Sequence, residues 1–319
     1  MNVLIVSAPL FALVLLGYLA ARLKLIPLTA LPGLNAYVLY FAMTAMLFRL
    51  GATNPISEMF NVSLMGVWMT GAWTVLALGI IPGLKSGLGW RNASFGGLAA
   101  SSPNLGFMGI PLVSALVGQE ALGALMPVLI IDIILLQSTV LALSQRGSAE
   151  PSSALRQLRA SGRGIVANPL LWAMVLGACW GATGWTMAGP AQETISLLAD
   201  SATPVALFTI GAVLAREQIA ARGIERSGIK AYIGWLTALK LLALPGLMWL
   251  ICQAAIAAGM PVSGDARTVL VLLAALPTAA NTSILAERFK ADNAVVASVI
   301  LASTAGGFIT FNVIAALVA

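Results

Sequence analysis

The sequence contains no histidine, only two cysteines and few charged residues, and each shortage excludes a class of chemistry. Without histidine, the chain cannot form a Ser-His-Asp or Cys-His nucleophile, a histidine-ligated haem or a histidine-containing zinc site. Cys179 and Cys252 lie in apolar runs and form no CxxC pair, so we interpret them as packing residues. Neither a phosphate-binding loop motif nor a dinucleotide-binding glycine motif occurs. The sequence therefore predicts neither an enzyme nor a metal site or other resident cofactor.

Apolar residues dominate instead. Of the 319 residues, 60% are hydrophobic and 9% are charged, and the mean hydropathy of +0.96 is far above that of a soluble domain. Lys and Arg number 17 against 11 Asp and Glu, which gives a formal net charge of +6. We expect no nucleic acid partner, because these charges lie in loops between apolar runs. The expected partner is the lipid bilayer.

Apolar runs of about 20 residues, the length that crosses a bilayer, recur along the whole chain. They predict an all-α polytopic membrane protein with ten transmembrane helices. The predicted spans are residues 3–21, 34–50, 63–81, 92–117, 121–143, 168–184, 195–215, 231–258, 268–286 and 294–318.

The positions of Lys and Arg predict the orientation of these spans. All but three of the 17 lie in the loops that follow the odd-numbered spans. The three exceptions are Arg49 and Arg267 on the opposite side and Lys240 inside the eighth span. Because cytoplasmic loops collect Lys and Arg, the chain is predicted to be multi-pass, with its N- and C-termini outside.

Residues 145–167, rich in Ser, Gly and Arg, are predicted to form a cytoplasmic linker between two halves, 1–144 and 168–319. Each half holds five spans, and an odd number means that the second half enters the membrane from the opposite side. When Pro9-Leu10 is aligned with Pro169-Leu170, Leu47-Phe48 falls on Leu207-Phe208. The sequence thus predicts a five-plus-five inverted repeat, a construction typical of secondary transporters.

Proline interrupts the fourth and ninth spans among small polar residues, in the stretches from Ser101 to Gly106 and from Ala274 to Ser283. Proline removes a backbone donor and clashes with the preceding turn, and Ser, Thr and Asn can satisfy the groups that this frees. Broken helices at equivalent places in two halves indicate a transport site, where half-helix N-termini suit a carboxylate and freed carbonyls suit a cation. Two ordinary proline kinks are the alternative.

The segment from Ser102 to Leu112 resembles the fourth-helix signature of the auxin efflux carrier family, which includes plant PIN proteins and bacterial malonate-type carriers. Ala275 to Pro277 with Ala286 to Phe289 is similar to the ninth helix of that family, and Ala199 to Ala202 is similar to the seventh. The resemblance implies that helices 4 and 9 cross at their prolines. It also implies a scaffold of helices 1, 2, 6 and 7, a moving transport bundle of helices 3–5 and 8–10, and a place in the bacterial inner membrane.

The resemblance further implies that Asn104 and Gln137 lie near a substrate carboxylate. We therefore predict a secondary transporter that moves a small organic anion, malonate- or auxin-like, by alternating access at the crossing. The alternative is a membrane-embedded sensor or enzyme that binds an anion without moving it. The predicted substrate-binding residues are Pro103, Asn104, Gly106, Gln137, Pro277, Thr278 and Asn281.

Charged residues inside the spans are costly, so Asp132, Asp200 and Lys240 are candidates for ion coupling or for structural charges. Asp132 could carry a coupling proton or help hold Na⁺, or it could bond to a neighbouring helix. Asp200 could contact the substrate or an ion, or form a pair. Lys240 lies too deep to reach the cytoplasmic surface, so it pairs with a carboxylate or attracts the anion. Arg49 is interpreted as an interfacial residue.

The sixth span contains a pair of small residues, Gly177 and Gly181, at the spacing that lets two helices approach closely. Packing within this chain and a homodimer interface are equally compatible with this pattern.

Overall fold

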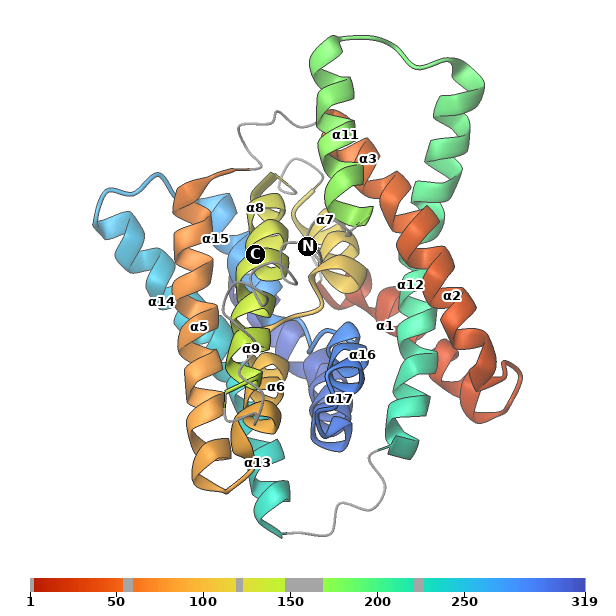
Figure 1. Cartoon of the computed structure of the whole chain (residues 1–319). Coiled ribbons are helices and arrows are strands. Elements are labelled where there is room, and N and C mark those ends of the chain that lie inside the picture. Colours follow the sequence, from red (N-terminus) through yellow and green to blue (C-terminus); the bar gives the residue numbers. More distant parts are fainter. Residues whose placement is uncertain (1–2, 54–59, 119–122, 147–168, 221–226, 319) are drawn as a thin grey trace.

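The computed structural model describes residues 3–53, 60–118, 123–146, 169–220 and 227–318, and the regular elements in these residues are helices (Figure 1). The prediction of an all-α fold is confirmed for this part of the chain. The helices of the first half are α1 (Val3–Arg22), η1 (Leu28–Ala30), α2 (Leu31–Tyr37), η2 (Val38–Ala42), α3 (Met43–Thr53), α5 (Val62–Lys85), α6 (Gly89–Ser101), η3 (Leu105–Gly109), α7 (Ile110–Leu116), α8 (Leu125–Ile131), η5 (Asp132–Leu136) and α9 (Gln137–Ser144).

The second half is described from Pro169 onward, so most of the predicted linker lies outside the described residues. Its long helix α12 extends beyond the predicted seventh span at both ends. The helices of this half are α11 (Pro169–Thr183), α12 (Gly189–Ala220), α13 (Ser227–Ala238), η6 (Leu239–Ala243), α14 (Leu244–Ala257), α15 (Gly264–Ala275), α16 (Asn281–Arg288) and α17 (Asn293–Val318).

Six helical stretches in the described residues are long and apolar enough to cross a membrane. They coincide with the predicted second, third, fifth, seventh, eighth and tenth spans. Shorter apolar helices fall in the first, fourth and sixth predicted spans, at Ala8–Arg22, Leu105–Leu116 and Trp172–Thr183. The six long stretches are Leu28–Thr53, Val62–Lys85, Leu125–Ser144, Gly189–Gln218, Ile229–Ala257 and Asn293–Val318.

The helices form two groups with α16 and α17 between them (Figure 1). In this view α1, α2, α3, α11 and α12 lie on the right, where α12 packs along α1 and α3, and α11 packs along α3. On the left, α5 packs along α6 and α14. The two broken helical segments, α6 to α7 and α15 to α16, belong to the left and central part of the molecule.

Helices α1 and α12 approach so closely that their contact requires glycine. A Cβ atom on Gly17 would lie 1.8 Å from the carbonyl oxygen of Phe208, and one on Gly211 would lie 1.9 Å from that of Val14. These distances are far below van der Waals contact. The α1/α12 contact is therefore backbone against backbone, as small residues permit in membrane helices.

Helices α3 and α11 repeat this contact in the other half. A Cβ atom on Gly177 would lie 2.1 Å from the carbonyl oxygen of Phe48, and one on Gly51 would lie 2.3 Å from that of Met174. The alignment that superposes Pro9 on Pro169 also superposes Gly17 on Gly177. Gly177 thus serves packing within this chain, which is one of the two uses that its spacing predicts.

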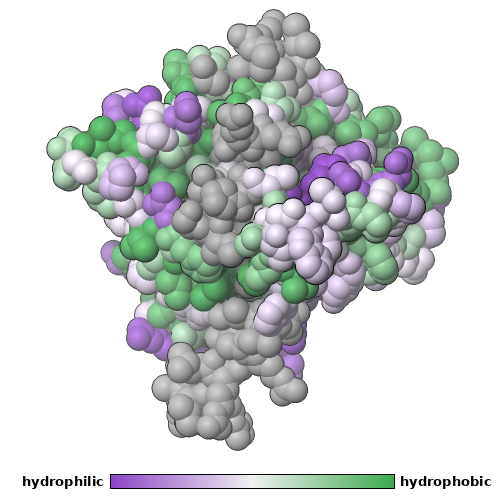
Figure 2. All heavy atoms as spheres, turned by 90° about the horizontal axis from the view of Figure 1, so that it is seen from above, coloured by the Kyte–Doolittle hydropathy of each residue, from purple (hydrophilic) through white to green (hydrophobic). Residues whose placement is uncertain are grey.

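The outer surface is rich in exposed hydrophobic side chains. Figure 2 shows hydrophobic residues over much of the periphery, with hydrophilic residues gathered in patches. Large apolar patches of this kind mark a surface that faces lipid or a partner. Well-exposed examples are Leu16 in α1, Trp172 in α11, Leu197 in α12, Leu242 in η6, and Ile309 and Leu317 in α17.

We expect Gly17→Ala to destabilise the protein, because the added methyl group would overlap the Phe208 carbonyl oxygen. Overpacking of this kind costs about 1–3 kcal/mol. Thermal unfolding in detergent measures the effect. The matched control is Gly66→Ala in α5, where an added Cβ meets no atom within 4 Å. Equal melting temperatures for the two variants would contradict the close α1/α12 contact.

Candidate functional site

The two helix breaks lie side by side and bond to each other. The Asn104 backbone N–H donates to the Pro277 carbonyl oxygen at 2.9 Å, and the Ala279 N–H donates to the Ser102 carbonyl oxygen at 3.1 Å. Pro103 and Thr278 face each other in this short antiparallel bridge. The extended chain at each break therefore supplies the hydrogen-bond partners of the other.

Each proline also leaves a helical carbonyl without its usual partner. Pro103 has no N–H to give to Ala99, and the Thr278 hydroxyl takes that place by donating to the Ala99 carbonyl oxygen at 2.7 Å. The Thr278 backbone N–H, which a continuous helix would direct to Ala274, donates instead to the Ser303 hydroxyl at 3.1 Å. Thr278 thus bonds to both α6 and α17, and its substitution would disturb both.

Lys240 satisfies the carbonyl that Thr278 leaves free. Its Nζ donates to the Ala274 carbonyl oxygen at 2.8 Å, and its side chain is fully buried. Lys240 lies in the π-helical turn η6, a widened turn of a kind often found at functional sites. Its direct hydrogen-bond partner is thus a backbone carbonyl. Lys240 forms no ion pair with Asp132, the buried acid nearby.

Asp132 connects the first break to a second π-helical turn, η5. The Ser102 hydroxyl donates to Asp132 Oδ2 at 3.0 Å, and Oδ1 has no hydrogen-bond partner among the described residues. The indole N–H of Trp68 lies beside the same carboxyl group, outside strict hydrogen-bond geometry. The Lys240 ammonium is near enough to attract it electrostatically. Asp132 therefore keeps one oxygen available for a proton or a cation.

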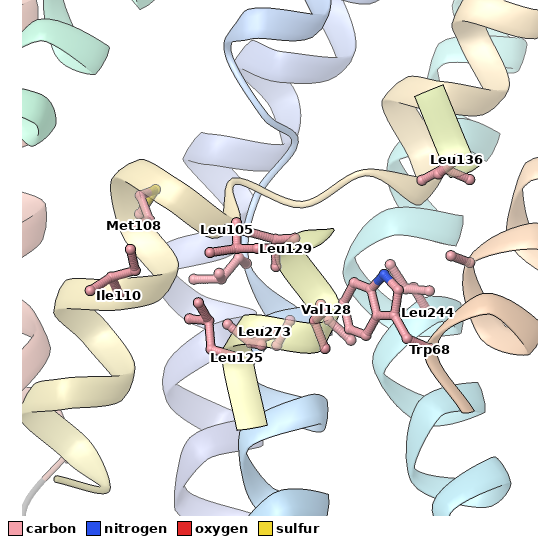
Figure 3. Close-up of a cluster of buried hydrophobic side chains, with 14 of the residues drawn as sticks. Trp68, Leu105, Met108, Ile110, Leu125, Val128, Leu129, Leu136, Leu244 and Leu273 are labelled. Carbon is pink, nitrogen blue, oxygen red and sulfur yellow. The ribbon is translucent and has the colours of Figure 1, made fainter. Parts of the chain in front are cut away.

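Hydrophobic side chains surround these polar groups. Figure 3 shows Trp68 beside Val128 and Leu244. Buried leucines from η3, α8 and α15 lie near the extended chain of the first break; the figure labels Leu105, Leu125, Leu129 and Leu273. Since water is largely excluded from such surroundings, an unpaired backbone or side-chain group would be costly. This explains why most polar groups at the breaks have partners within the chain.

The other predicted substrate residues lie at different distances from this centre. Asn104 is buried directly at the break, and Gly106 follows it in η3, where it lines a cavity of about 10 Å³ with Met43. Gln137 begins α9 and is half-buried. It lines neither this cavity nor the larger pocket between α1, α3, α7 and α12. Asn281 begins α16 and is exposed. The structure thus brings Pro103, Asn104, Pro277 and Thr278 together, and leaves Gln137 and Asn281 outside that contact.

A larger pocket, about 570 Å³ in volume, opens between α1, α3, α7 and α12. Arg49 and Asp200 line it, and Arg49 Nη1 donates to Asp200 Oδ1 at 2.8 Å. Asp200 therefore forms an ion pair, one of the roles considered from the sequence. Arg49 was interpreted as an interfacial residue from its position at a helix end. The sequence could not indicate that it lines a pocket.

Glu217 is a buried charge that the sequence analysis missed. Its carboxylate accepts a hydrogen bond from the Ser283 hydroxyl at 2.8 Å and another from Arg216 Nε at 3.0 Å. The apolar run ends at Ala215, so Glu217 was assigned to a loop, whereas α12 continues to Ala220. Glu217 lies roughly 25 Å beyond Asp200 along α12, from the rise of 1.5 Å per residue. It joins α12 to α16 at the end opposite the large pocket.

No cluster of three or more His, Cys, Asp or Glu side chains that could hold a metal ion occurs among the described residues.

The chain is similar to known transport proteins over almost its whole length. The family described as "Membrane transport protein" matches residues 3–315. A Rhizobium meliloti (strain 1021) protein named "Putative malonate transporter" is 30% identical over 287 residues, which cover 88% of this chain and 85% of the relative. "Auxin efflux carrier component 8" of Arabidopsis thaliana is 23% identical over 266 residues, which cover 68% of this chain and 72% of the relative. "Uncharacterized transporter YfdV" of Escherichia coli (strain K12) is 26% identical over 298 residues, covering 88% and 86%.

We expect Thr278→Val to destabilise the protein, because the buried Ala99 carbonyl would lose the hydroxyl that replaces the missing proline N–H. A buried polar group left unsatisfied costs about 1–3 kcal/mol. Thermal unfolding measures the change. In the control, Thr237→Val, the lost hydroxyl bonds only to Ile233 in its own helix. If Thr278→Val has the same melting temperature as the control variant, the two breaks do not depend on this hydrogen bond.

Proposed function

Because the chain belongs to the membrane transport protein family, we propose that it is a secondary transporter that moves a small organic anion by alternating access. Membership of this family identifies a multi-pass membrane transporter rather than an enzyme, and it confirms the resemblance to auxin efflux carriers. The proposal adds the substrate class, the mechanism and the place of binding. It also places the protein in the bacterial inner membrane with both termini outside.

The observation that carries the proposal is the hydrogen-bonded pair of helix breaks. Two helices that end and restart beside each other direct helix termini, with their partial charges, at one point inside the membrane. The breaks precede η3 on one side and α16 on the other, so the N-termini of both continuing helices lie near this point. Such N-termini favour an anion. Asn104, at the first break, is the side chain that we assign to the substrate carboxylate.

The ten-helix inverted repeat is supported by the glycine contacts between α1 and α12 and between α3 and α11. These two contacts exchange when the halves of the chain are aligned, as a pseudo-twofold axis would require. Close backbone contact between helices suits the role of a rigid scaffold. The groups α1 to α3 with α11 and α12 thus form the proposed scaffold, and the broken helices belong to the moving bundle.

The anion class is supported by the names of the relatives. One is named for malonate and another for auxin, and both are carboxylates at neutral pH. The positive field of the helix N-termini at the breaks fits that chemistry. We propose malonate- and auxin-like carboxylates as the substrates of this chain.

The arrangement of the two ends supports an alternating-access cycle. At the end near Arg49 a pocket of about 570 Å³ separates α12 from α7, whereas at the other end Glu217 of α12 bonds to Ser283 of α16. From the Lys and Arg distribution we propose that the Arg49 end faces outside the cell. The structure then corresponds to an outward-facing state, and breaking the Glu217 contact would accompany opening to the cytoplasm. Asp132, with its unpartnered oxygen, is the residue through which we propose H⁺ or Na⁺ coupling.

We expect the purified protein in sealed proteoliposomes to exchange labelled malonate, acetate or indole-3-acetate across the membrane. Asn104→Ala should lower the flux about tenfold or more, because the substrate carboxylate would lose a hydrogen bond from Asn104 that is worth about 1.5–3 kcal/mol. Asn35→Ala, in α2, is the control. Saturable binding without flux in either orientation would refute transport and favour a sensor. Unchanged flux and affinity in Asn104→Ala would refute the assignment of Asn104.

Asp132→Asn tests ion coupling. The amide has nearly the same shape, and its oxygen still accepts the bond from Ser102, so we expect the protein to remain folded. The variant cannot gain or lose the proton, so the flux should no longer depend on an imposed pH or Na⁺ gradient. The variant should then carry the substrate only down the substrate's own concentration gradient. Initial rates with and without each gradient measure this. If gradients drive accumulation in the variant as in the unmodified protein, Asp132 is not the coupling residue.

A further inference from the structure

The large pocket lies away from the helix breaks and has its own charged group. It contains Arg49 from α3 and Asp200 from α12, and the opposite wall is formed by α7, with Pro111 and Ala115. Helices α3 and α12 pack against each other, so the two charges are held on one side of the pocket. A ligand in the pocket would therefore contact the charged side chains of α3 and α12 on one side. On the other side it would contact α7, the helix that comes after the first break in the sequence.

The Arg49–Asp200 pair leaves most of the guanidinium free to bind something else. One N–H group, on Nη1, is used in the bond of 2.8 Å to Oδ1. A guanidinium has five N–H donors in a planar fork. Among the described residues, Asp200 is the side chain that Arg49 bonds to, and the two side chains are 38% and 67% exposed. Because Arg49 lines the pocket and is partly exposed, donors beyond that one are within reach of a ligand in the pocket.

Stability alone does not account for this pair. Exposed ion pairs with a single contact contribute about 0–1 kcal/mol, because solvent screens them and two side chains must be ordered. The useful consequence of the pair is orientation. Asp200 holds the Arg49 side chain in one position, so a ligand that binds to the guanidinium does not have to order it.

We propose that this pocket is an entry site for carboxylate anions, in which the Arg49 guanidinium binds the carboxylate and Asp200 positions Arg49. Planar guanidinium and carboxylate groups form two parallel hydrogen bonds, which is the strongest pairing available to either. The proposal rests on the proposed transport of an organic anion. It adds a first binding step, separate from the one at the breaks.

The position of the pocket suits that order of events. Ala115 follows Asn104 along η3 and α7, at roughly 15 Å from the rise of a helix. An anion released from Arg49 would therefore move along α7 toward the break. Asp200 also limits how tightly the anion binds, since the negative carboxylate repels a second one. An entry site of this kind raises the local anion concentration without retaining the substrate.

Accessibility of a cysteine in the pocket tests the proposal without measuring transport. Ala115→Cys is made in a Cys179→Ser background, and Cys252 can remain because it is buried. The rate of modification by neutral N-ethylmaleimide, added from the Arg49 side in proteoliposomes, is measured with increasing malonate, acetate or indole-3-acetate. A neutral reagent avoids direct attraction to either charge. We expect at least one of these carboxylates to slow the modification about threefold or more at saturation.

Two charge variants should then act in opposite directions. Arg49→Gln removes the anion-binding group and should abolish the protection. Asp200→Asn removes the competing negative charge and should move protection to severalfold lower carboxylate concentration. Arg267→Gln, which removes a positive charge bonded to Gln253 away from this pocket, is the matched control and should leave protection unchanged. Thermal unfolding of each variant verifies that it is folded.

A purely structural pair would give a different pattern. In that case Arg49→Gln and Asp200→Asn would weaken protection equally, and either this result or full protection in Arg49→Gln would overturn the proposal. So would the absence of protection by all three carboxylates in the cysteine variant. Flux without protection would refute the entry site and leave transport standing. Protection without flux would refute transport and leave the anion site standing.

Discussion

Pro103 and Pro277 impose the constraint on which the rest of this structure depends. Each interrupts a helix where lipid and hydrophobic side chains offer no water, and each frees backbone groups that would be costly if unpaired. The breaks solve this together, because the chain at Ser102 to Asn104 bonds to the chain at Pro277 to Ala279. Neither break would be stable alone. The site where transport is proposed is therefore also one of the points where the two halves of the chain are bonded to each other.

The buried charges follow from the same constraint. Lys240 donates to the carbonyl that the ninth-span break leaves free, and Asp132 accepts a bond from Ser102 at the fourth-span break. Each break is thus connected to one buried charge, and the two charges attract each other without touching. A change of charge at Asp132 would act on the first break directly and on the second through Lys240. This connection gives a proposed coupling ion a physical route to the substrate site.

Much of this could be predicted from the sequence, because hydropathy and proline act locally. Apolar length located the helices, and the polar residues beside Pro103 and Pro277 identified the breaks. Glu217 was missed because a charged pair ended the apolar run, although α12 continues past it. Burial and the Ser283 bond make that position tolerable, and both come from another helix. The pocket at Arg49 could not be predicted either, since it is formed by four helices.

The sequence by itself determined the all-α class, the apolar segments and the positions of the two breaks, since each depends on residues that are neighbours along the chain. Only the tertiary structure decided which groups meet: Asn104 with Pro277, Thr278 with Ala99, Lys240 with Ala274, and Arg49 with Asp200. These partners are far apart in sequence, and no local pattern selects one partner over another. Close helix packing at Gly17 and Gly177 brings distant segments together, and hydrogen bonding of the freed groups then favours one arrangement.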